Sequence, residues 1–155
     1  MDKILRIDMG AASGPKAAIT PLGDYAGMGG RGMTSMVVSR EVPADCHPLG
    51  PENKLVIAMG PLSGLAFAGA ARFCVGAKSP LTGGIAKSEA GGYWMADMKR
   101  AGDDAIIVEG RSERPVYLWI DDGKAEIRDA SRLWGKDVKE TQEIIQAESA
   151  LVNSC

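Results

Sequence analysis

The residues of this sequence that suggest ligand binding are glycines in four clusters, one of which contains an arginine. The chain has 20 glycines, whereas glycine usually makes up about 7% of residues, and they gather at 27–32, 60–69, 83–84 and 91–92. Because glycine lacks a side chain, its backbone can approach a ligand closely or adopt a positive φ. Such clusters suit loops that cradle a ligand, although ordinary tight turns use them too. Arg31, between two glycines, is a candidate for binding an anion, with a plain surface position at equal weight.

The cysteine and histidine side chains lack the spacing of a metal site. Cys46, Cys74 and Cys155 are far apart, so the chain has no Cys-x-x-Cys pair and no zinc or iron–sulfur spacing. The single histidine, His47, follows Cys46 directly. Adjacent side chains point apart, so we expect a loop histidine and no metal ligand. Unpaired thiols fit a reducing compartment, and we expect a cytoplasmic protein.

Charge and composition exclude several classes of function. The formal net charge of −2 gives no general attraction to nucleic acid or to an anionic membrane. No apolar run approaches the ~20 residues that span a bilayer, and the charges within residues 1–6 are unlike a signal peptide. With 155 residues, 45% of them apolar and 25% charged, the chain is expected to form one globular domain.

Strand and helix patterns interleave along the chain and predict the elements that position the glycine loops. We expect strands at 4–9, 16–20, 54–59, 71–77 and 105–109 and helices at 33–40 and 92–101, with 54–59 and 105–109 as buried strands. Met33, Met36 and Val37 should share one face of the first helix. Trp94 and Met98, four residues apart, are expected to lie in the core along the second helix.

The C-terminal third contains the clearest local patterns. Apolar residues alternate along 116–120, Asp122-Gly123 is typical of a hairpin turn, and 124–128 supplies the returning strand. Asp137 can cap a final helix that has Glu140 at its third position. Helices and strands that alternate, with an antiparallel hairpin among them, predict an α+β fold.

The sequence also shows a weak internal similarity. A glycine pair, a helix and an apolar strand that ends in glycine occur at 29–60 and again at 91–110. Two copies do not establish a repeat, but they permit a duplicated α+β unit.

Many short blocks, in a fixed order over nearly the whole chain, resemble the N-terminal domain of the aldehyde ferredoxin oxidoreductase family. A lone glycine-rich loop would be weak support, whereas so many blocks in one order are specific. The blocks are Gly29–Gly32, Pro51–Leu55, Gly60–Gly64, Lys78–Gly83, Gly91–Tyr93, Ala101-Gly102, Asp104–Gly110, Ile127–Ala130 and Leu133–Lys136.

The resemblance implies a duplicated α+β domain that forms a base for a metal cofactor. In the family, tungsten or sometimes molybdenum is held by the dithiolene sulfurs of two pterins. The cofactor therefore brings its own metal ligands, which accounts for their absence from this sequence. The protein must supply hydrogen-bond donors, cations and glycine backbone for the pterin and phosphate groups.

Residues 72 and 89–92 match the part of the family that contacts the pterin. Arg72 matches a pterin-contacting arginine and Gly91 a glycine whose backbone approaches the pterin, with Ala90 and Gly92 beside it. Glu89 stands at a neighbouring contact position where a member of the family has asparagine. A carboxylate cannot donate a hydrogen bond unless protonated, so that contact is either rearranged or lost.

These assignments have plain alternatives. Judged by residue type alone, Arg72 could lie on a solvated strand face. Gly91-Gly92 could simply break the chain before a helix. Lys78 and Ser79 suit the cap of a turn as well as a phosphate contact.

Several segments that members of the family contain are missing from this sequence. They are a second pterin-binding segment, the cysteines that ligate a [4Fe–4S] cluster, and the acidic and histidine residues of the substrate pocket. We therefore expect residues 1–155 to be a single, truncated N-terminal domain. Its implied partners are the missing C-terminal domains or a companion subunit, through which electrons reach ferredoxin.

Two hypotheses follow. In the first, the chain is the pterin-binding portion of an oxidoreductase that converts an aldehyde to a carboxylate, and it is inactive alone. In the second, it is a non-catalytic homologue that binds a pterin or phosphate ligand or assembles into a homo-oligomer, because a missing domain would expose apolar surface. The sequence does not decide between tungsten and molybdenum, and it does not identify the aldehyde substrate.

Overall fold

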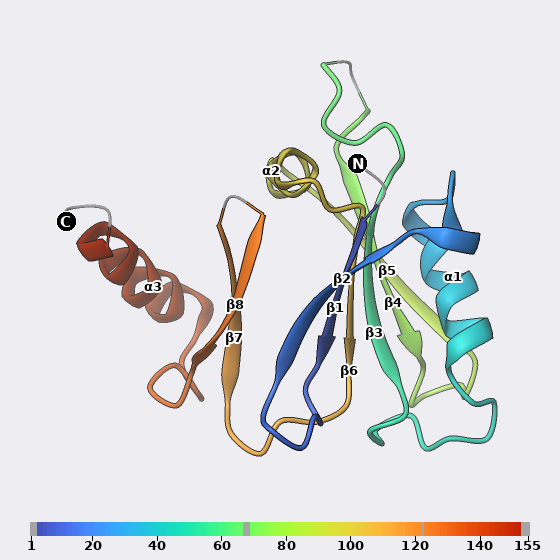
Figure 1. Cartoon of the computed structure of the whole chain (residues 1–155), viewed down its shortest axis with the longest axis horizontal. Helices are drawn as coiled ribbons and strands as arrows, with labels where there is room; N and C mark the ends of the chain where they lie inside the picture. The colour runs from blue at the N-terminus through green and yellow to red at the C-terminus, as the bar shows by residue number, and fades with distance from the viewer. Residues whose placement is uncertain (1–2, 67–68, 122, 153–155) are drawn as a thin grey trace.

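A six-stranded mixed sheet and a separate two-stranded hairpin form the framework of the molecule (Figure 1). The computed structural model describes residues 3–66, 69–121 and 123–152. The elements are β1 (Lys3–Asp8), β2 (Lys16–Pro21), a 3-10 turn (Gly23–Tyr25), α1 (Gly30–Glu41), β3 (Lys54–Met59), β4 (Arg72–Lys78), β5 (Ile85–Gly91), α2 (Trp94–Ala101), β6 (Ala105–Glu109), β7 (Val116–Asp121), β8 (Lys124–Asp129) and α3 (Val138–Val152).

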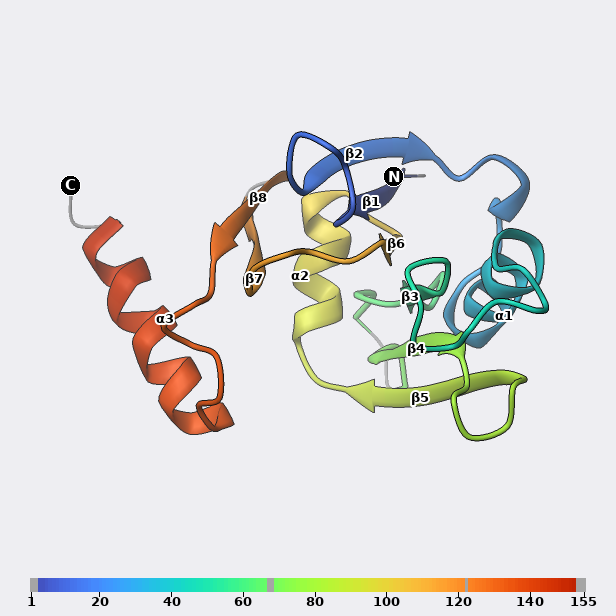
Figure 2. The same ribbon diagram turned by 90° about the horizontal axis from the view of Figure 1, so that it is seen from below.

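The strand order in the large sheet is β2-β1-β6-β3-β4-β5, so that β2 and β5 form its two edges (Figure 2). Strands β1 and β6 run parallel, and the other neighbouring pairs are antiparallel. Helix α1 covers one face of the sheet, while α2 and the β7–β8 hairpin lie on the other face (Figures 1 and 2). The protein is thus an α+β domain with a core on each side of its sheet.

Helix α1 forms the first core by burying one side against the central strands. Met33 and Val37 are four residues apart and are both fully buried, against Val56 of β3 and Ile107 of β6. Met36, which we expected on the same face, is partly buried at its border. The predicted apolar face is therefore confirmed at Met33 and Val37 and is peripheral at Met36.

The second core lies between the sheet, helix α2 and the hairpin. Met95 and Met98 of α2 are buried, and partly buried apolar residues of β7 and β8 pack against them. The prediction for Met98 is confirmed, whereas that for Trp94 is wrong, because this side chain remains 42% exposed. The Trp94 ring instead packs over Phe73 at the border, with 5.0 Å between the ring centroids.

A very close contact between α1 and β4 fixes the distance of the helix from the sheet. A Cβ atom added at Gly76 would lie 2.6 Å from the Thr34 Cβ and 2.9 Å from its hydroxyl oxygen. The Thr34 hydroxyl also lies 3.6 Å from the Cys74 sulfur. Thr34 therefore sits directly on the backbone of β4, which only a glycine at position 76 permits.

An ion-pair network at the C-terminal end of α1 ties the helix to three strands. The Glu41 carboxylate accepts hydrogen bonds from Arg6 of β1 at 2.7 and 2.8 Å, from the Tyr25 hydroxyl at 2.8 Å and from Lys54 of β3 at 3.1 Å. Lys54 also pairs with Glu109 of β6. The Arg6 hydrogen bonds, above all, lower the pKa of Glu41 to about 2. Burial, followed by the hydrogen bond to Glu41, raises the pKa of Tyr25 to about 12.

The sequence predicted most of these elements and missed two. Each strand and helix expected from the sequence is present, with ends shifted by at most a few residues. The Asp137 cap is confirmed, since its carboxylate accepts a 2.8 Å hydrogen bond from the Glu140 amide. Strand β5 and the 3-10 turn at 23–25 were not predicted. All seven residues of β5 are exposed, so the strand lacks the apolar alternation that reveals a half-buried strand.

The order of elements repeats, as the internal similarity of residues 29–60 and 91–110 suggested. Two strands, a helix and a third strand occur as β1-β2-α1-β3 and again as β4-β5-α2-β6. The third strands, β3 and β6, are antiparallel neighbours at the centre of the sheet. The copies differ in strand direction, because β1 is parallel to β6 whereas β4 is antiparallel to β3.

Acid should weaken the fold through Glu41. The folded-state pKa of about 2 lies below the ordinary glutamate pKa of 4.5, so the contribution of this group is fully present above pH 4.5 and is lost as the pH falls toward 2. We expect Glu41→Gln to lower the free energy of unfolding by about 2 kcal/mol at neutral pH, and the difference from the wild type to shrink in acid. Urea titrations at about pH 7 and about pH 2.5 measure both quantities.

Glu52→Gln, on an exposed loop, is the matched control and should change the free energy of unfolding by less than about 0.5 kcal/mol. A deficit of Glu41→Gln that stayed constant from neutral to acid pH would contradict the assigned network.

The contact of α1 with β4 predicts opposite effects of two glycine substitutions. Gly76→Ala should destabilise the protein by about 1–3 kcal/mol, because the new methyl group overlaps Thr34. Gly32→Ala, inside α1 with open space around its Cβ position, should stabilise it by up to about 1 kcal/mol through helix propensity. Thermal or urea unfolding of both variants tests this, and equal stability of the two would refute the close packing.

Candidate functional site

The antiparallel pairing of β4 with β5 brings the predicted ligand residues together at one edge of the sheet. In its register, Arg72 lies opposite Gly91, Phe73 opposite Ala90, and Cys74 opposite Glu89. Residues that are about twenty positions apart in the sequence are therefore direct cross-strand neighbours. This register belongs to β5, the strand that the sequence did not predict.

Side-chain alternation divides these residues between the two faces of the sheet. Cys74 and Gly76 contact Thr34 of α1, so Arg72, at the same period of two, faces the α1 side as well. Across the ladder, Lys87, Glu89 and Gly91 lie opposite Gly76, Cys74 and Arg72 and share that face. Ala90 lies opposite Phe73, which packs in the other core. Of the predicted set, Arg72, Glu89 and Gly91 therefore converge, and the side chain of Ala90 points away.

The start of helix α1 adds a further cation to this face. Gly29 precedes the helix and packs against the end of β3, where an added Cβ would lie 2.5 Å from the Met59 carbonyl oxygen. Arg31 lies one helical turn before Thr34 and so on the same side of α1. The first turn of α1 has no side-chain cap, and its free amide groups contribute positive potential. Arg31, Arg72 and Lys87 are named the cation cluster below.

Glu89 is the carboxylate within the cation cluster. It accepts a 2.7 Å hydrogen bond from Lys87, two residues away on the same face of β5. This bond and the charge of Lys87 lower the pKa of Glu89, and the charges of Arg31 and Arg72 lower it further. All three cations therefore act on one carboxylate, and the group as a whole keeps an excess of positive charge.

Gly91 and Gly92 have different structural reasons to be glycine. A Cβ at Gly91 would lie 3.1 Å from the Ala71 carbonyl oxygen, so a side chain here would press on the neighbouring strand. Gly92 has a φ of 129°, with open space around it, and it turns the chain from β5 toward α2. The prediction that Gly92 breaks the chain before a helix is therefore supported by its positive φ.

Other candidates from the sequence have structural roles. The Lys78 ammonium donates to the carbonyl oxygens of Pro43 and Ala44, and the Ser79 hydroxyl accepts hydrogen bonds from the amides that follow it in a turn. The turn reading is thus the correct one for these two residues. His47 accepts a hydrogen bond from the Leu49 amide within its own loop, as expected.

Within residues 3–66, 69–121 and 123–152, no group of three or more His, Cys, Asp or Glu side chains is arranged to hold a metal ion. Cys46 and Cys74 are buried free thiols, and Cys155 lies outside the described residues. No helix in the described part of the chain is long and apolar enough to cross a membrane.

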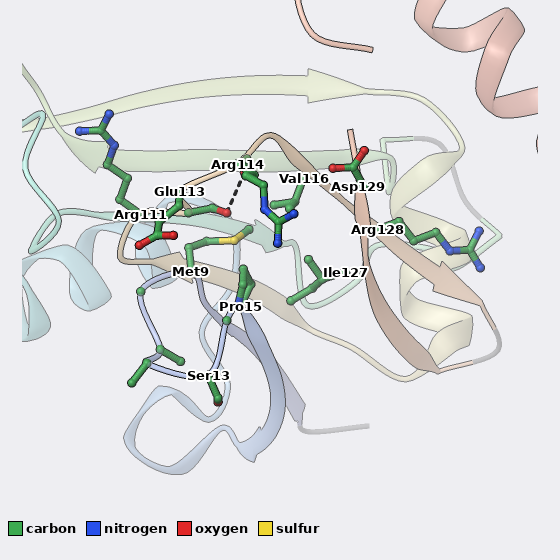
Figure 3. A pocket seen from close by; sticks show the side chains of 15 residues that line it. Met9, Ser13, Pro15, Arg111, Glu113, Arg114, Val116, Ile127, Arg128 and Asp129 are labelled. Carbon is green, nitrogen blue, oxygen red and sulfur yellow. Dashed lines mark hydrogen bonds between the residues drawn. The ribbon is translucent and has the colours of Figure 1, made fainter. Parts of the chain in front are cut away.

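A cavity of about 500 Å³ lies near the opposite end of the strands, between residues 9–15, residues 111–116 and the end of β8 (Figure 3). The Arg114 guanidinium points into it over Ile127 and Pro15, whereas Arg111 and Arg128 point outward (Figure 3). Arg128 is bound by Glu126 and stacks over Trp119. The cavity contains none of the residues predicted to bind the cofactor, so the edge of β4 and β5 remains the candidate site.

The fold is that of an oxidoreductase domain. The structure is similar to a solved chain described as the active-site complex BamBC of benzoyl coenzyme A reductase in complex with 1,5-dienoyl-CoA, with a TM-score of 0.85 and 38% identity. That match covers 96% of this chain and 23% of the other. The family described as aldehyde ferredoxin oxidoreductase, N-terminal domain, matches residues 4–154. The chain belongs to the aldehyde ferredoxin oxidoreductase family, as the sequence blocks implied.

Its curated relatives are much longer proteins. Tungsten-containing aldehyde ferredoxin oxidoreductases from Pyrococcus furiosus and Thermococcus kodakarensis are 49% and 50% identical over 121 residues, which is 78% of this chain and 20% of each relative. The WOR-like subunit of an aliphatic sulfonate oxidoreductase from Pyrococcus furiosus is 36% identical over 110 residues. The chain spans about a fifth of the length of these relatives.

Proposed function

We propose that the chain is the cofactor-supporting domain of a tungsten- or molybdenum-pterin oxidoreductase, and that it holds one pterin through the edge of β4 and β5. The observation that carries the proposal is that Arg72 lies directly opposite Gly91, while Arg72, Lys87 and Arg31 act together on Glu89, two residues from Gly91. Cations and exposed amides are the groups that recognise phosphate-bearing ligands.

These residues fit a pterin with its phosphate, and they do so without supplying a metal ligand. Arg72 and Arg31 would bind the negative charge, and the backbone at Gly91 would approach the ring closely because no side chain intervenes. The metal–pterin group, when bound, supplies the redox chemistry. The residues of this chain bind and orient it and make no bond to a substrate.

Substrate choice belongs to other parts of the complete protein. The relatives that share this domain include aldehyde, sulfonate and benzoyl coenzyme A enzymes, as their names state. A common domain among enzymes with such different substrates is expected to hold what they share, which is a cofactor. By family, the proposed reaction is oxidation of an aldehyde to a carboxylate, with electrons passed to ferredoxin through an iron–sulfur cluster held by the remaining domains or a companion subunit in the cytoplasm.

A second candidate function is supported by the surface near α3. Trp134 is 78% exposed and Val138 is 84% exposed, beside an apolar cavity of about 570 Å³ lined by Leu133 and Tyr117. Exposed apolar groups of this size favour association. A non-catalytic homologue that assembles with itself through this surface is the alternative.

Loss of the Arg72 charge should release the cofactor. In the protein purified without oxygen from its native host, together with any chain that carries the remaining domains, we expect co-purifying tungsten or molybdenum and pterin. Arg72→Gln should weaken cofactor retention by about tenfold or more, as expected for a lost charged hydrogen bond. Elemental analysis and pterin fluorescence measure this.

The control is Arg100→Gln, an exposed arginine on α2 that pairs with Asp97 and should retain the full complement of metal and pterin. A wild-type protein that holds neither metal nor pterin would reject the proposal.

The 155-residue chain alone should be catalytically silent. It supplies the cofactor cradle in the proposal and no group for the bond-making steps, so aldehyde oxidation with a ferredoxin or dye acceptor is expected to stay at background. Light scattering on the same sample separates the two candidates. A homo-oligomer with no affinity for pterin supports the self-assembling homologue, and a turnover signal from the isolated chain contradicts both.

A further inference from the structure

Glu89 is bonded to one member of the cation cluster and is influenced by the charges of the other two, and its side chain stays partly exposed. The Lys87–Glu89 pair has a 2.7 Å bond between Nζ and Oε1, and the two side chains are 44% and 32% exposed. Among the described residues, Lys87 is the one that donates a hydrogen bond to the Glu89 side chain. The pair stands on β5, whose residues are all exposed. A partly exposed pair of this kind is weak and can open.

The groups that hold Glu89 are those that a phosphate would need. A carboxylate and a phosphate are both oxyanions that accept hydrogen bonds from Lys and Arg. Lys87 donates to Glu89 directly, and Arg31 and Arg72 act on the same carboxylate through their charges. The backbone register holds Arg72 and Gly91 opposite each other, two residues beyond the Cys74–Glu89 pair. An anion placed beside Gly91 would therefore compete with Glu89 for the same cations.

We propose that Glu89 is an internal competitor for the anion site, and that the phosphate of the ligand gains the cation cluster when the Glu89 carboxylate rotates away from Lys87. The inference rests on the proposed function of this edge as a phosphate-binding site. Glu89 thereby sets the affinity of the site. It also favours anions of higher charge, because a phosphate with a charge of about −1.5 to −2 and three acceptor oxygens displaces a single carboxylate.

Titration calorimetry with inorganic pyrophosphate on the complete chain tests this competition. We expect Glu89→Gln to bind pyrophosphate about tenfold more tightly than the wild type, because a like charge is removed from beside the bound anion. Glu52→Gln removes the same charge from an exposed loop before β3 and should leave the Kd unchanged. Adding Arg72→Gln to the Glu89→Gln variant should abolish the gain. Circular dichroism of each variant verifies its fold.

The other outcomes overturn the inference. An unchanged Kd in Glu89→Gln would show that the carboxylate does not compete, and no binding by either protein would show that this edge is not an anion site. Weaker binding would show that Glu89 helps to hold the anion, for example through a divalent cation. Failure of the proposed function looks different. In that case Glu89→Gln would bind pyrophosphate more tightly, yet the protein from its host would contain no metal and no pterin.

Discussion

The placement of the candidate site depends on the close packing of helix α1 against strand β4. Thr34 sits on the backbone at Gly76, and Gly29 packs on the end of β3, so the N-terminal turn of α1 is fixed relative to the sheet edge. At the other end of the helix, the Glu41 network joins α1 to β1 and β3. Because both ends of α1 are attached, Arg31 stays near Glu89 of β5 even though its own side chain is exposed.

The sheet edge combines a rigid backbone with an exposed surface. Strand β5 has β4 on one side, and its side chains remain exposed on both faces. An exposed edge is a risk for unwanted strand pairing, and charged side chains such as Lys87 and Glu89 are a common protection. The same charges create the ligand site in our proposal. In that proposal, one set of residues protects the edge from strand pairing and gives it a preference for anions.

The sequence predicted the fold better than it predicted the site. Buried strands such as β3 and β6 are apolar runs, and the Asp137 cap is a local signal, so each was visible without tertiary information. Strand β5 forms because β4 pairs with it, and nothing in its own apolar pattern shows this. The resemblance supplied Arg72 and Gly91 as separate positions. The register that makes them neighbours, and the addition of Lys87, follow from long-range pairing that a single sequence does not reveal.

Glu89 is the residue at which the sequence resemblance implied an asparagine, and its surroundings accommodate a carboxylate. An isolated carboxylate beside a phosphate would repel it. Here Lys87 neutralises the carboxylate from two residues away on the same strand face, and Arg31 and Arg72 leave the group with positive charge in excess. A glutamate at this position therefore leaves the net charge of this group of side chains positive. In our proposal, the cations hold this acidic group until a stronger anion arrives.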